Sequence, residues 1–468
     1  MSKFVSVMQE EPMSIFCRMV IDTKYEDLPS NVINRAKQSI LDVTGVMIGG
    51  SAMEGIPPVV DLVKDKGGKP ETVIPFYGGK VPASEAGLAM GPMSRAMDFA
   101  EIHPEGFHCT EHTVPALLAA TGLKDKVTGK EFITAFVVGQ EIMLRIGIAF
   151  KPSKAWTFGM TTGHYIFGSI AAVGKLIGLS QEELENAEGI GREMTQPHDT
   201  AMLNPCTLML KVHQGFIAQD AINACLLARR GITGPRREVL VGPRGYLSFP
   251  KWETDPSGLT KGLGEEWNLL NVAMKPYIGC LSAHTSMHGI IEQMGEHNFG
   301  AGDIAAIDID QPPASWRLAC TPWEEKMNPQ TEYEYQFSLP YLMATAVYDK
   351  DVFLTSFTAE AKARQSVRSL MARISAKEDT GLPAWATKLT TTLKDGRKYS
   401  KEYFSADVKG SSQNPFTEQE LIAKFKRSIP YSAYKLSDTT VDSVIKTILN
   451  LEKVDDVVSA LLLPLTPM

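Results

Sequence analysis

The sequence predicts a mainly α-helical protein with two domains, one large and all-helical and one smaller and of the α+β class. Three observations predict this: helical spacing of apolar residues up to about Leu270, strand-like alternation after Lys275, and a return to helical spacing near Thr417. A chain of 468 residues is long enough for two or three domains. We therefore expect a discontinuous helical domain, residues 1–270 and 409–468, around an α+β domain at 271–408.

Small residues stand among the apolar ones in the first helices. Asn31 to Gly49 places its apolar side chains at helical spacing, and Gly168 to Leu179 interleaves glycine and alanine with larger apolar residues. Helices with small residues on several faces are usually buried inside a bundle. Capping boxes mark where three helices begin: Thr128 with Glu131, Ser180 with Glu183, and Thr417 with Glu420.

Strand patterns identify the α+β domain. Ile304 to Asp310 alternates between apolar and polar residues and is followed by two prolines, as at the end of a strand. Ala386 to Tyr403 holds two β-rich runs on either side of Asp395-Gly396, a dipeptide typical of a tight hairpin turn. The domain is therefore expected to contain a hairpin and at least one further strand.

Helical spacing occupies much of the rest of the second half. Gln336 to Tyr348 and Ser356 to Ile374 are each expected to form a helix beside the strands, and helix is predicted again from Thr417 to Leu451. The tail from Leu461 contains two prolines and is expected to be loosely ordered.

Composition excludes several classes of protein. Forty-seven basic against fifty-four acidic residues give a net charge of −7, which argues against nucleic acid as a partner. The six cysteines are scattered, so a reducing cytoplasm is expected rather than a disulfide framework. The most apolar stretch, Ile133 to Phe150, is interrupted by Gln140, Glu141 and Arg145, so we expect no membrane span. The expected partner is a small molecule.

Three of the nine histidines, His103, His108 and His112, lie within ten residues, close after Asp98. An aspartate and a histidine facing a small cleft can remove a proton in an elimination, protonate a carbanion after decarboxylation, or exchange a proton in an epimerisation. The alternative is that these are polar residues at helix ends with purely structural hydrogen bonds. The cluster is nevertheless the first candidate for an active site.

Two cofactor motifs are partly present. His108 to His112 spells H-x-x-E-H, in which two histidines on a helix would hold zinc and Glu111 would act as the base. Pro115 would disturb such a helix. Gly189-Ile-Gly191 resembles the start of a dinucleotide-binding loop but lacks the third glycine. We therefore expect neither a metal nor an organic cofactor.

Five segments have residues and an order found in one known family: Ala36 to Gly49, Arg95 to Pro115, Gly168 to Leu179, Gly231 to Leu247 and Met274 to Glu292. With them the sequence resembles the MmgE/PrpD family, which includes 2-methylcitrate dehydratase, cis-aconitate decarboxylase and iminodisuccinate epimerase. The resemblance runs from about Asn31 to Leu451. It implies a large helical domain with a smaller α+β lid, a homodimer, and no organic cofactor.

The resemblance also implies site residues. Asp98 falls on the first Asp of the family's Asp-Phe-Asp-Asp element, and His108 on the His of its His-Pro-Ser element, so these are the expected catalytic residues, with His103 as a third. Lys275 opens a Lys-x-Tyr element that ends at Tyr277, and its ammonium group suits a substrate carboxylate. Tyr277 is expected to bind substrate as well, and three more positions are candidates for this role: Lys211, His213 and His284.

Four positions depart from the better-known family patterns. Ala100 replaces the second Asp, and Leu210 stands where the family has a lysine. Gly159 and Cys280 replace histidines of the decarboxylases. Dehydration of an alkylcitrate-like acid is therefore expected ahead of decarboxylation. Epimerisation of an iminodisuccinate-like dicarboxylate is the alternative, since it needs no acid for a leaving group. The third possibility is a family member that has lost its activity and only binds a ligand.

Overall fold

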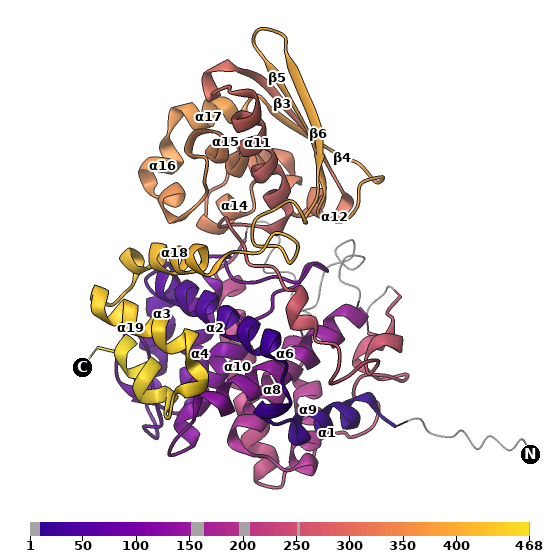
Figure 1. Ribbon diagram of the computed structural model, residues 1–468, viewed down its shortest axis with the longest axis vertical. Coiled ribbons are helices and arrows are strands. Elements are labelled where there is room, and N and C mark those ends of the chain that lie inside the picture. Colours follow the sequence, from indigo (N-terminus) through magenta and orange to yellow (C-terminus); the bar gives the residue numbers. More distant parts are fainter. Residues whose placement is uncertain (1–9, 151–162, 196–205, 250–252, 468) are drawn as a thin grey trace, which may run out of the picture.

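The computed structural model describes residues 10–150, 163–195, 206–249 and 253–467. The described residues pack around two hydrophobic cores, which Figure 1 shows as a helical part below an α+β part. The first core takes residues from Met13 to Met274 and again from Leu421 to Leu465. The second takes residues from Ile278 to Tyr403 and a few from the helical part: Val46, Met97, Phe99 and Ala100. The predicted class, mainly α with a smaller α+β part, is confirmed.

The helical part is built from long helices in the first half of the chain and two more near its end. Their bounds are α1 Pro12–Asp22, α2 Ser30–Gly50, α3 Ile56–Lys66, α4 Ala83–Arg95, α5 Thr113–Ala120, α6 Gly129–Phe150, α8 Tyr165–Ile177, α9 Gln181–Met194, α10 Met209–Arg229, α18 Glu418–Ser428 and α19 Asp438–Leu449. Two short strands, β1 (Thr72–Val73) and β2 (Lys80–Val81), pair antiparallel. In Figure 1, α18 and α19 lie beside α2, to which both are packed, so the end of the chain returns to its beginning.

Small residues let the central helices approach closely, as the sequence pattern indicated. Helices α4 and α10 meet at Gly91 and Gly215, where a β-carbon on Gly91 would lie 2.5 Å from the backbone nitrogen of Gly215. Similarly, a β-carbon on Gly139 in α6 would lie 2.5 Å from the carbonyl oxygen of Gly168 in α8. Any larger side chain at these crossings would force the helices apart. All three predicted capping boxes are present, at Thr128, Ser180 and Thr417.

Helix α6 is long and apolar enough to cross a membrane by length and composition, but 94% of its apolar window is buried inside the protein. Glu141 and Arg145, on successive turns of α6, form a buried ion pair at 2.7 Å. The Arg145 guanidinium also donates to backbone carbonyls of residues 258–266, which fold over it. Helix α6 is thus a core helix, in agreement with the prediction from its interrupted apolar stretch.

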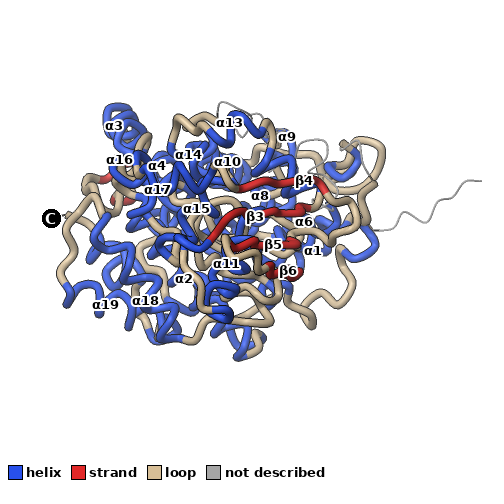
Figure 2. Tube along the Cα trace, turned by 90° about the horizontal axis from the view of Figure 1, so that it is seen from above, coloured by secondary structure: helices blue, strands red, loops and turns tan. Residues whose placement is uncertain are grey.

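The α+β part is a four-stranded sheet with helices on one side. The sheet order is β4-β3-β5-β6, with β3 Ile304–Gln311, β4 Ile374–Glu378, β5 Thr387–Leu393 and β6 Lys398–Tyr403. Figure 2 shows these strands side by side. Strands β5 and β6 form the predicted hairpin around Gly396, whose φ of +89° suits a tight turn. The helices are α11 His284–His297, α12 Pro313–Ser315, α13 Trp323–Met327, α14 Glu332–Gln336, α15 Leu339–Asp349, α16 Ala359–Ala363 and α17 Gln365–Met371.

The single helix predicted over Ser356 to Ile374 is wrong. The structure has a 3-10 turn, then α16 and α17, which are separated at Arg364 because that residue has an extended backbone with ψ of 109°. The Arg364 guanidinium pairs with Asp349 at the end of α15. Ile374 opens β4, which pairs in parallel with β3 at Ile307. Tertiary pairing therefore decides the conformation of this segment against its helical spacing.

Two expectations about the C-terminal region also need correction. The helix predicted from Thr417 to Leu451 is broken after α18, where Pro430 lies in a 3-10 turn and cannot donate to a helical carbonyl. The tail is not loosely ordered in its described part. Leu461, Leu462 and Leu465 are buried in the first core, and the Phe76 N–H donates to the carbonyl of Leu465 at 2.8 Å.

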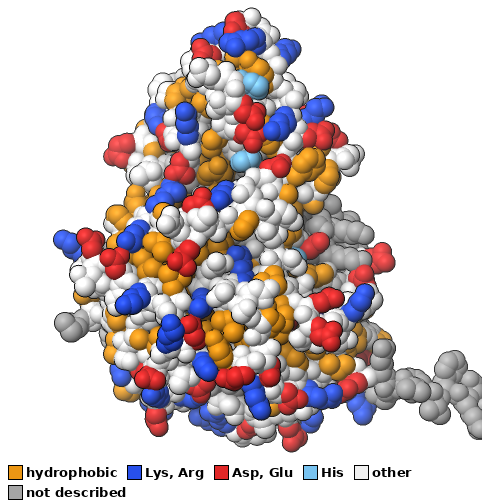
Figure 3. All heavy atoms as spheres, viewed as in Figure 1, with side chains coloured by type: hydrophobic (Ala, Val, Ile, Leu, Met, Phe, Trp, Pro, Cys, Tyr) orange, Lys and Arg blue, Asp and Glu red, His pale blue; other side chains and the backbone are white. Residues whose placement is uncertain are grey.

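The face of the molecule in Figure 3 mixes basic, acidic and apolar side chains along both parts. On this face no continuous basic surface of the kind that binds nucleic acid is visible.

Candidate active site

The candidate site forms where α4 ends. After Arg95, the last residue of α4, the chain turns through residues 96–102, which we call the Asp98 loop. Asp98 is buried and has a φ of +47°, a left-handed conformation that is uncommon outside glycine. Its N–H donates to the carbonyl of Arg95, and its own carbonyl accepts from Gly279 N–H at 3.3 Å. The strained turn is thus held from both sides.

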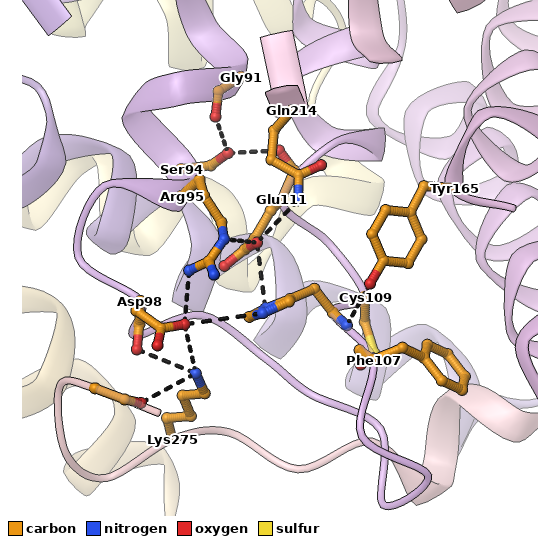
Figure 4. A network of polar contacts seen from close by, with 12 residues as sticks. Gly91, Ser94, Arg95, Asp98, Phe107, Cys109, Glu111, Tyr165, Gln214 and Lys275 are labelled. Atoms are coloured by element: carbon orange, nitrogen blue, oxygen red, sulfur yellow. Dashed lines mark hydrogen bonds and ion pairs between the residues drawn. The ribbon is translucent and has the colours of Figure 1, made fainter. Parts of the chain in front are cut away.

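Two cations contact one oxygen of the Asp98 carboxylate. Arg95 Nη1 lies 2.6 Å and Lys275 Nζ 2.7 Å from Asp98 Oδ1, and all three side chains are almost fully buried (Figure 4). Burial alone would raise the pKa of Asp98, but the charges of Arg95 and Lys275 outweigh it and hold this pKa well below its usual range. Asp98 is therefore ionised at neutral pH, and it fixes the positions of both cations.

Lys275 joins the two parts of the molecule. It lies on the segment by which the chain passes from the helical core, at Met274, to the second core, at Ile278. Besides the Asp98 carboxylate, its Nζ donates to the carbonyl oxygens of Asp98, at 3.2 Å, and Gly279, at 3.3 Å. Lys275 and Asp98, both named as site residues from the sequence, therefore meet at the junction.

His108 stands between two carboxylates. Its Nε2 lies 3.8 Å from Asp98 Oδ1, and its Nδ1 lies 3.2 Å from Glu111 Oε2. The backbone N–H of His108 donates to the hydroxyl of Tyr165 on α8, which fixes the backbone of the histidine (Figure 4). Burial lowers the pKa of His108, and Glu111 opposes that shift only in part. The imidazole is therefore neutral at neutral pH, with Nδ1 placed to carry the proton and Nε2 left as a base.

Glu111 is itself held in place by three groups. Arg95 Nε lies 3.6 Å from Glu111 Oε2, and Gln214 Nε2 on α10 donates to the same oxygen at 3.5 Å. The Ser94 hydroxyl donates to the backbone carbonyl of Glu111. Arg95 thus links both carboxylates, Asp98 and Glu111, on the two sides of His108. The cluster is built by the end of α4, the loop before α5, one side chain from α10, and Lys275 from the segment that crosses to the second core.

Three other predicted residues lie near Lys275 but outside this cluster. His103 Nδ1 accepts from the backbone N–H of Glu105 at 3.1 Å, and its ring stacks on Phe107. His284 Nε2 contacts the carbonyl of Gly279 at 3.1 Å, and its ring faces that of Tyr277 at 5.8 Å between centroids. None of His103, His284 and Tyr277 has a recorded contact with the carboxylate of Asp98.

Lys211 and His213, near the start of α10, differ in their relation to the cluster. Lys211 is fully buried, donates to the carbonyl of Glu54 at 3.0 Å, and lies 5.0 Å from the centre of the Tyr333 ring. Burial lowers its pKa, and the positive charge of Arg95 adds to that shift. His213 is half-buried on the same helix. The charge of Arg95 thus reaches Lys211.

The departures from the family pattern leave apolar or neutral groups. Ala100 packs in the second core. Leu210 and Cys280 are buried in one small cluster with Tyr333. Burial raises the pKa of the Cys280 thiol, so it stays neutral where the decarboxylases have a histidine. Gly159 lies outside the described residues.

The H-x-x-E-H segment does not form the helical zinc motif. Helix α5 begins at Thr113, so His108 precedes the helix and Pro115 lies in its first turn. His112 is buried with its ring stacked on Tyr165. Among the described residues, the group whose donor atoms come together is Asp98, His108 and Glu111, within 4.8 Å of one another. Arg95 and Lys275 already occupy this group's carboxylates, so a divalent cation there would face two fixed positive charges.

The sequence did not single out Arg95 as a site residue, and it brought up Glu111 only as the base of a zinc motif. Both are charged residues in buried stretches of the chain. Positions 83–95 of α4 are mostly apolar, and Glu111 lies within a buried run. A charge in such a run needs a buried partner. That rule could have marked both, although it does not say which partner each would find.

A helical fold with a buried carboxylate–histidine–lysine cluster at the junction to an α+β part is typical of enzymes that move protons. Comparison with known families gives the class directly. Residues 14–255 match the MmgE/PrpD N-terminal domain, and residues 277–450 match the MmgE/PrpD C-terminal domain. The chain belongs to the MmgE/PrpD family.

Curated relatives match along almost the whole chain. A cis-aconitate decarboxylase-like protein of Aspergillus oryzae is 25% identical, with 94% of each chain covered. Cis-aconitate decarboxylase of Homo sapiens is 25% identical over 94% of this chain and 92% of its own. The enzyme of Mus musculus is 24% identical over 94% and 91%. The family rests on the two domain matches, and at 24–25% identity the relatives leave the reaction of this protein open.

Proposed function

We propose that the protein is a lyase that acts on a small di- or tricarboxylate by proton transfer at a carbon next to a carboxylate. The observation that carries the proposal is the position of His108 between Glu111 and the Asp98–Lys275–Arg95 ion cluster. The family membership and the names of the relatives support it, because cis-aconitate is a tricarboxylate.

His108 is the proposed proton carrier. A neutral imidazole whose Nδ1 faces the Glu111 carboxylate has its free electron pair on Nε2, which is the arrangement of a general base held by a second group. Asp98, by contrast, is held ionised by two cations and is a weak base. We therefore assign proton removal to His108, and to Asp98 the role of positioning Lys275 and the imidazole.

Lys275 and Arg95 are the proposed carboxylate-binding groups, with Lys211 beside them. When a proton leaves a carbon next to a carboxylate, negative charge develops on the carboxylate oxygens. Fixed cations at that place stabilise the developing charge without reorganising at the moment of reaction. The carboxylate of Asp98 holds Lys275 and Arg95 in place until the substrate arrives.

Elimination of water is our first choice among the reactions. The neutral state of His108 favours proton removal. The proton that the imidazole takes from carbon can then pass to the departing hydroxyl, which leaves as water. Decarboxylation, by contrast, needs an acid that is already protonated when CO2 leaves. Cys280 as a neutral thiol, in place of a decarboxylase histidine, also favours elimination. The second candidate is decarboxylation of cis-aconitate, and the observation in its favour is the name shared by the relatives at 24–25% identity. Epimerisation of an iminodisuccinate-like acid remains the alternative from a different class.

One experiment separates these reactions. The purified protein is mixed in D2O with 2-methylcitrate, cis-aconitate or iminodisuccinate and followed by proton NMR. Loss of water from 2-methylcitrate is the expected result. It would be seen as collapse of the methyl doublet to a singlet if the proton leaves the methyl-bearing carbon, or as a new vinyl signal if it leaves the methylene carbon. Loss of CO2 from cis-aconitate would replace elimination by decarboxylation, and deuterium exchange on iminodisuccinate alone would replace it by epimerisation. No change in any of the three would contradict the proposal for this substrate class.

We further propose, from the family resemblance, a cytoplasmic homodimer that needs no cofactor. Sedimentation analysis at micromolar concentration should show a particle of twice the chain mass of 51.3 kDa. Full turnover after extensive dialysis against a chelator would support independence from metals.

A further inference from the structure

A cavity of about 170 Å³ lies at the junction of the two parts, behind Lys275 as seen from Asp98. Both segments by which the chain crosses between the parts line it, residues 273–276 on the way out and residues 405–413 on the way back. The remaining walls come from residues 102–104 of the helical part, residues 281–285 at the start of α11, and Trp385. Asp98, His108, Glu111 and Arg95 are not among its walls.

The walls of this cavity, which we call the hinge cavity, are mostly apolar and carry no unpaired charge. Its apolar side chains include Ile102, Met274 and Leu281. Two lysines reach it, and both are matched: Lys275 by Asp98 at 2.7 Å, and Lys409 by Glu420 at 2.8 Å. A charged occupant would therefore find no free countercharge on these walls. An uncharged, mainly apolar molecule suits these walls.

Three polar side chains on the walls have hydrogen-bonding capacity left over. Because His103 Nδ1 accepts from a backbone N–H, its proton is on Nε2, which can donate. Because His284 Nε2 faces a carbonyl oxygen, its proton is on that atom, and Nδ1 can accept. Thr285 is 2% exposed, and its hydroxyl has no hydrogen-bond partner. A buried hydroxyl is normally hydrogen-bonded, so the unpartnered hydroxyl of Thr285 indicates an occupant.

Burial lowers the pKa of both His103 and His284 to about 3, so both rings are neutral at neutral pH. The cavity therefore offers one N–H donor, one imidazole acceptor and one hydroxyl, all uncharged. A hydroxyl group on a ligand could accept from His103 and donate to His284 or Thr285.

We propose that the hinge cavity is a second ligand site, separate from the acid–base cluster, for an uncharged molecule of about the size of a benzene ring that carries one hydroxyl or similar group. A dry apolar cavity of about 150 Å³ is large enough for benzene, which sets the scale for the ligand. Since the cavity is lined by both crossing segments, an occupant fixes the relative position of the two parts. Since Lys275 is on one of these segments, the occupant also acts on the cluster.

Benzyl alcohol is the probe, used with the full-length protein in calorimetric titration and in a crystal soak. We expect saturable binding in the millimolar range and electron density between His103 and Thr285. Toluene, which lacks the hydroxyl, should bind more weakly, and benzoate, which is charged, should not bind in the cavity. Because the experiment measures binding and not turnover, its outcome does not depend on the reaction proposed above.

Two variants test the placement. Thr285→Val removes the unpaired hydroxyl at nearly constant volume and should weaken benzyl alcohol binding by about 2- to 10-fold without affecting toluene. The matched control is Thr345→Val in α15, a buried threonine that does not line the cavity. Equal effects of the two variants, density for water alone in the cavity, or binding only beside Asp98 would each overturn the proposal. Val408→Phe, which fills the cavity, should abolish binding in a protein whose thermal unfolding is still cooperative.

Discussion

Two clusters of buried charges lie at opposite ends of the Asp98 loop, and they treat their carboxylates in opposite ways. At the start of the loop, Arg95 and Lys275 share one oxygen of Asp98 and lower its pKa. At the end, Glu101 has a single arginine, Arg35, at 3.3 Å and one hydrogen bond from Ser39 at 2.7 Å. Burial raises the pKa of Glu101 to about 7.

The second cluster also contains an ion pair between α2 and α18. Lys424 Nζ lies 2.5 Å from Asp42 Oδ1, donates to the carbonyl of Phe99 at 3.0 Å, and lies 4.0 Å from the centre of the Phe99 ring. Burial raises the pKa of Asp42 and lowers that of Lys424. Burial does not by itself set the charge of these carboxylates. At Asp98 two cations on one oxygen outweigh burial, whereas at Glu101 a single arginine does not.

The two clusters also differ in access. The side chain of His108 in the first cluster is 14% exposed, whereas that of Glu101 in the second is fully buried. The imidazole of His108 is therefore open to a substrate and the carboxylate of Glu101 is not, although Arg35 beside Glu101 is 12% exposed. Variants in the first should affect turnover, and variants in the second should affect stability.

The largest effect is expected for His108→Gln. Loss of the base should lower kcat by about 10²- to 10⁴-fold with little change in the free energy of unfolding. Steady-state kinetics on the substrate found by NMR measures the first quantity, and urea denaturation the second. His297→Gln, an exposed histidine stacked on Tyr399, is the control and should turn over normally. Turnover of H108Q at the wild-type rate would remove His108 from the mechanism.

In the second cluster, Lys424→Met should lower the free energy of unfolding by about 3–5 kcal/mol, because it leaves Asp42 buried without a cation. Lys426→Met on the same helix breaks a half-exposed pair with Asp442 and should cost less than about 1 kcal/mol. Urea titrations of both variants measure the difference. Equal losses would mean that the Asp42–Lys424 pair does not support the Asp98 loop.

Glu101→Gln tests whether the second cluster makes the free energy of unfolding depend on pH. A carboxyl whose pKa rises from 4.5 to about 7 on folding contributes stability that is complete below pH 4.5 and lost as the pH rises through 7. Above pH 7 the wild type should therefore be less stable than E101Q by about 3 kcal/mol, relative to their difference at pH 4. Glu402→Gln on the exposed side of β6 is the control. If the stability curves of E101Q and the wild type ran parallel, ionisation of Glu101 would not change the free energy of unfolding, and its pKa would not be raised.

The smallest effect is expected for Glu111→Gln, which keeps the shape of the first cluster but removes the charge behind His108. We expect a loss of about 10- to 100-fold in kcat, as for groups that orient another residue. Because Glu111 raises the pKa of His108, the acidic limb of kcat/KM should move to lower pH in the variant. A lower kcat with an unmoved pH profile would make Glu111 a purely structural residue.

Much of the fold could be predicted because its signals are local. The Asp395-Gly396 turn, the alternation of Ile304 to Asp310 and the three capping boxes each depend on residues close in sequence. Strand β4 could not be predicted this way, because it forms by pairing with β3 far earlier in the chain. Pro430 was a local signal for the break in the C-terminal helix that the helical spacing obscured.

The residues of the candidate site also fall into those that the sequence could predict and those that it could not. Asp98, His108 and Lys275 were predicted from the resemblance, and the structure brings them together. Arg95 and Glu111 complete the cluster only through contacts between α4, the loop before α5 and α10, and no spacing in the sequence encodes those distances.

The crossing of α4 and α10 at Gly91 and Gly215 limits how this protein can change over generations. Arg95 lies one turn beyond Gly91 on α4, and Lys211 one turn before Gly215 on α10. A single added methyl group at either glycine would separate the helices and with them the two cations. Selection on substrate use would therefore act on two residues that never touch a substrate.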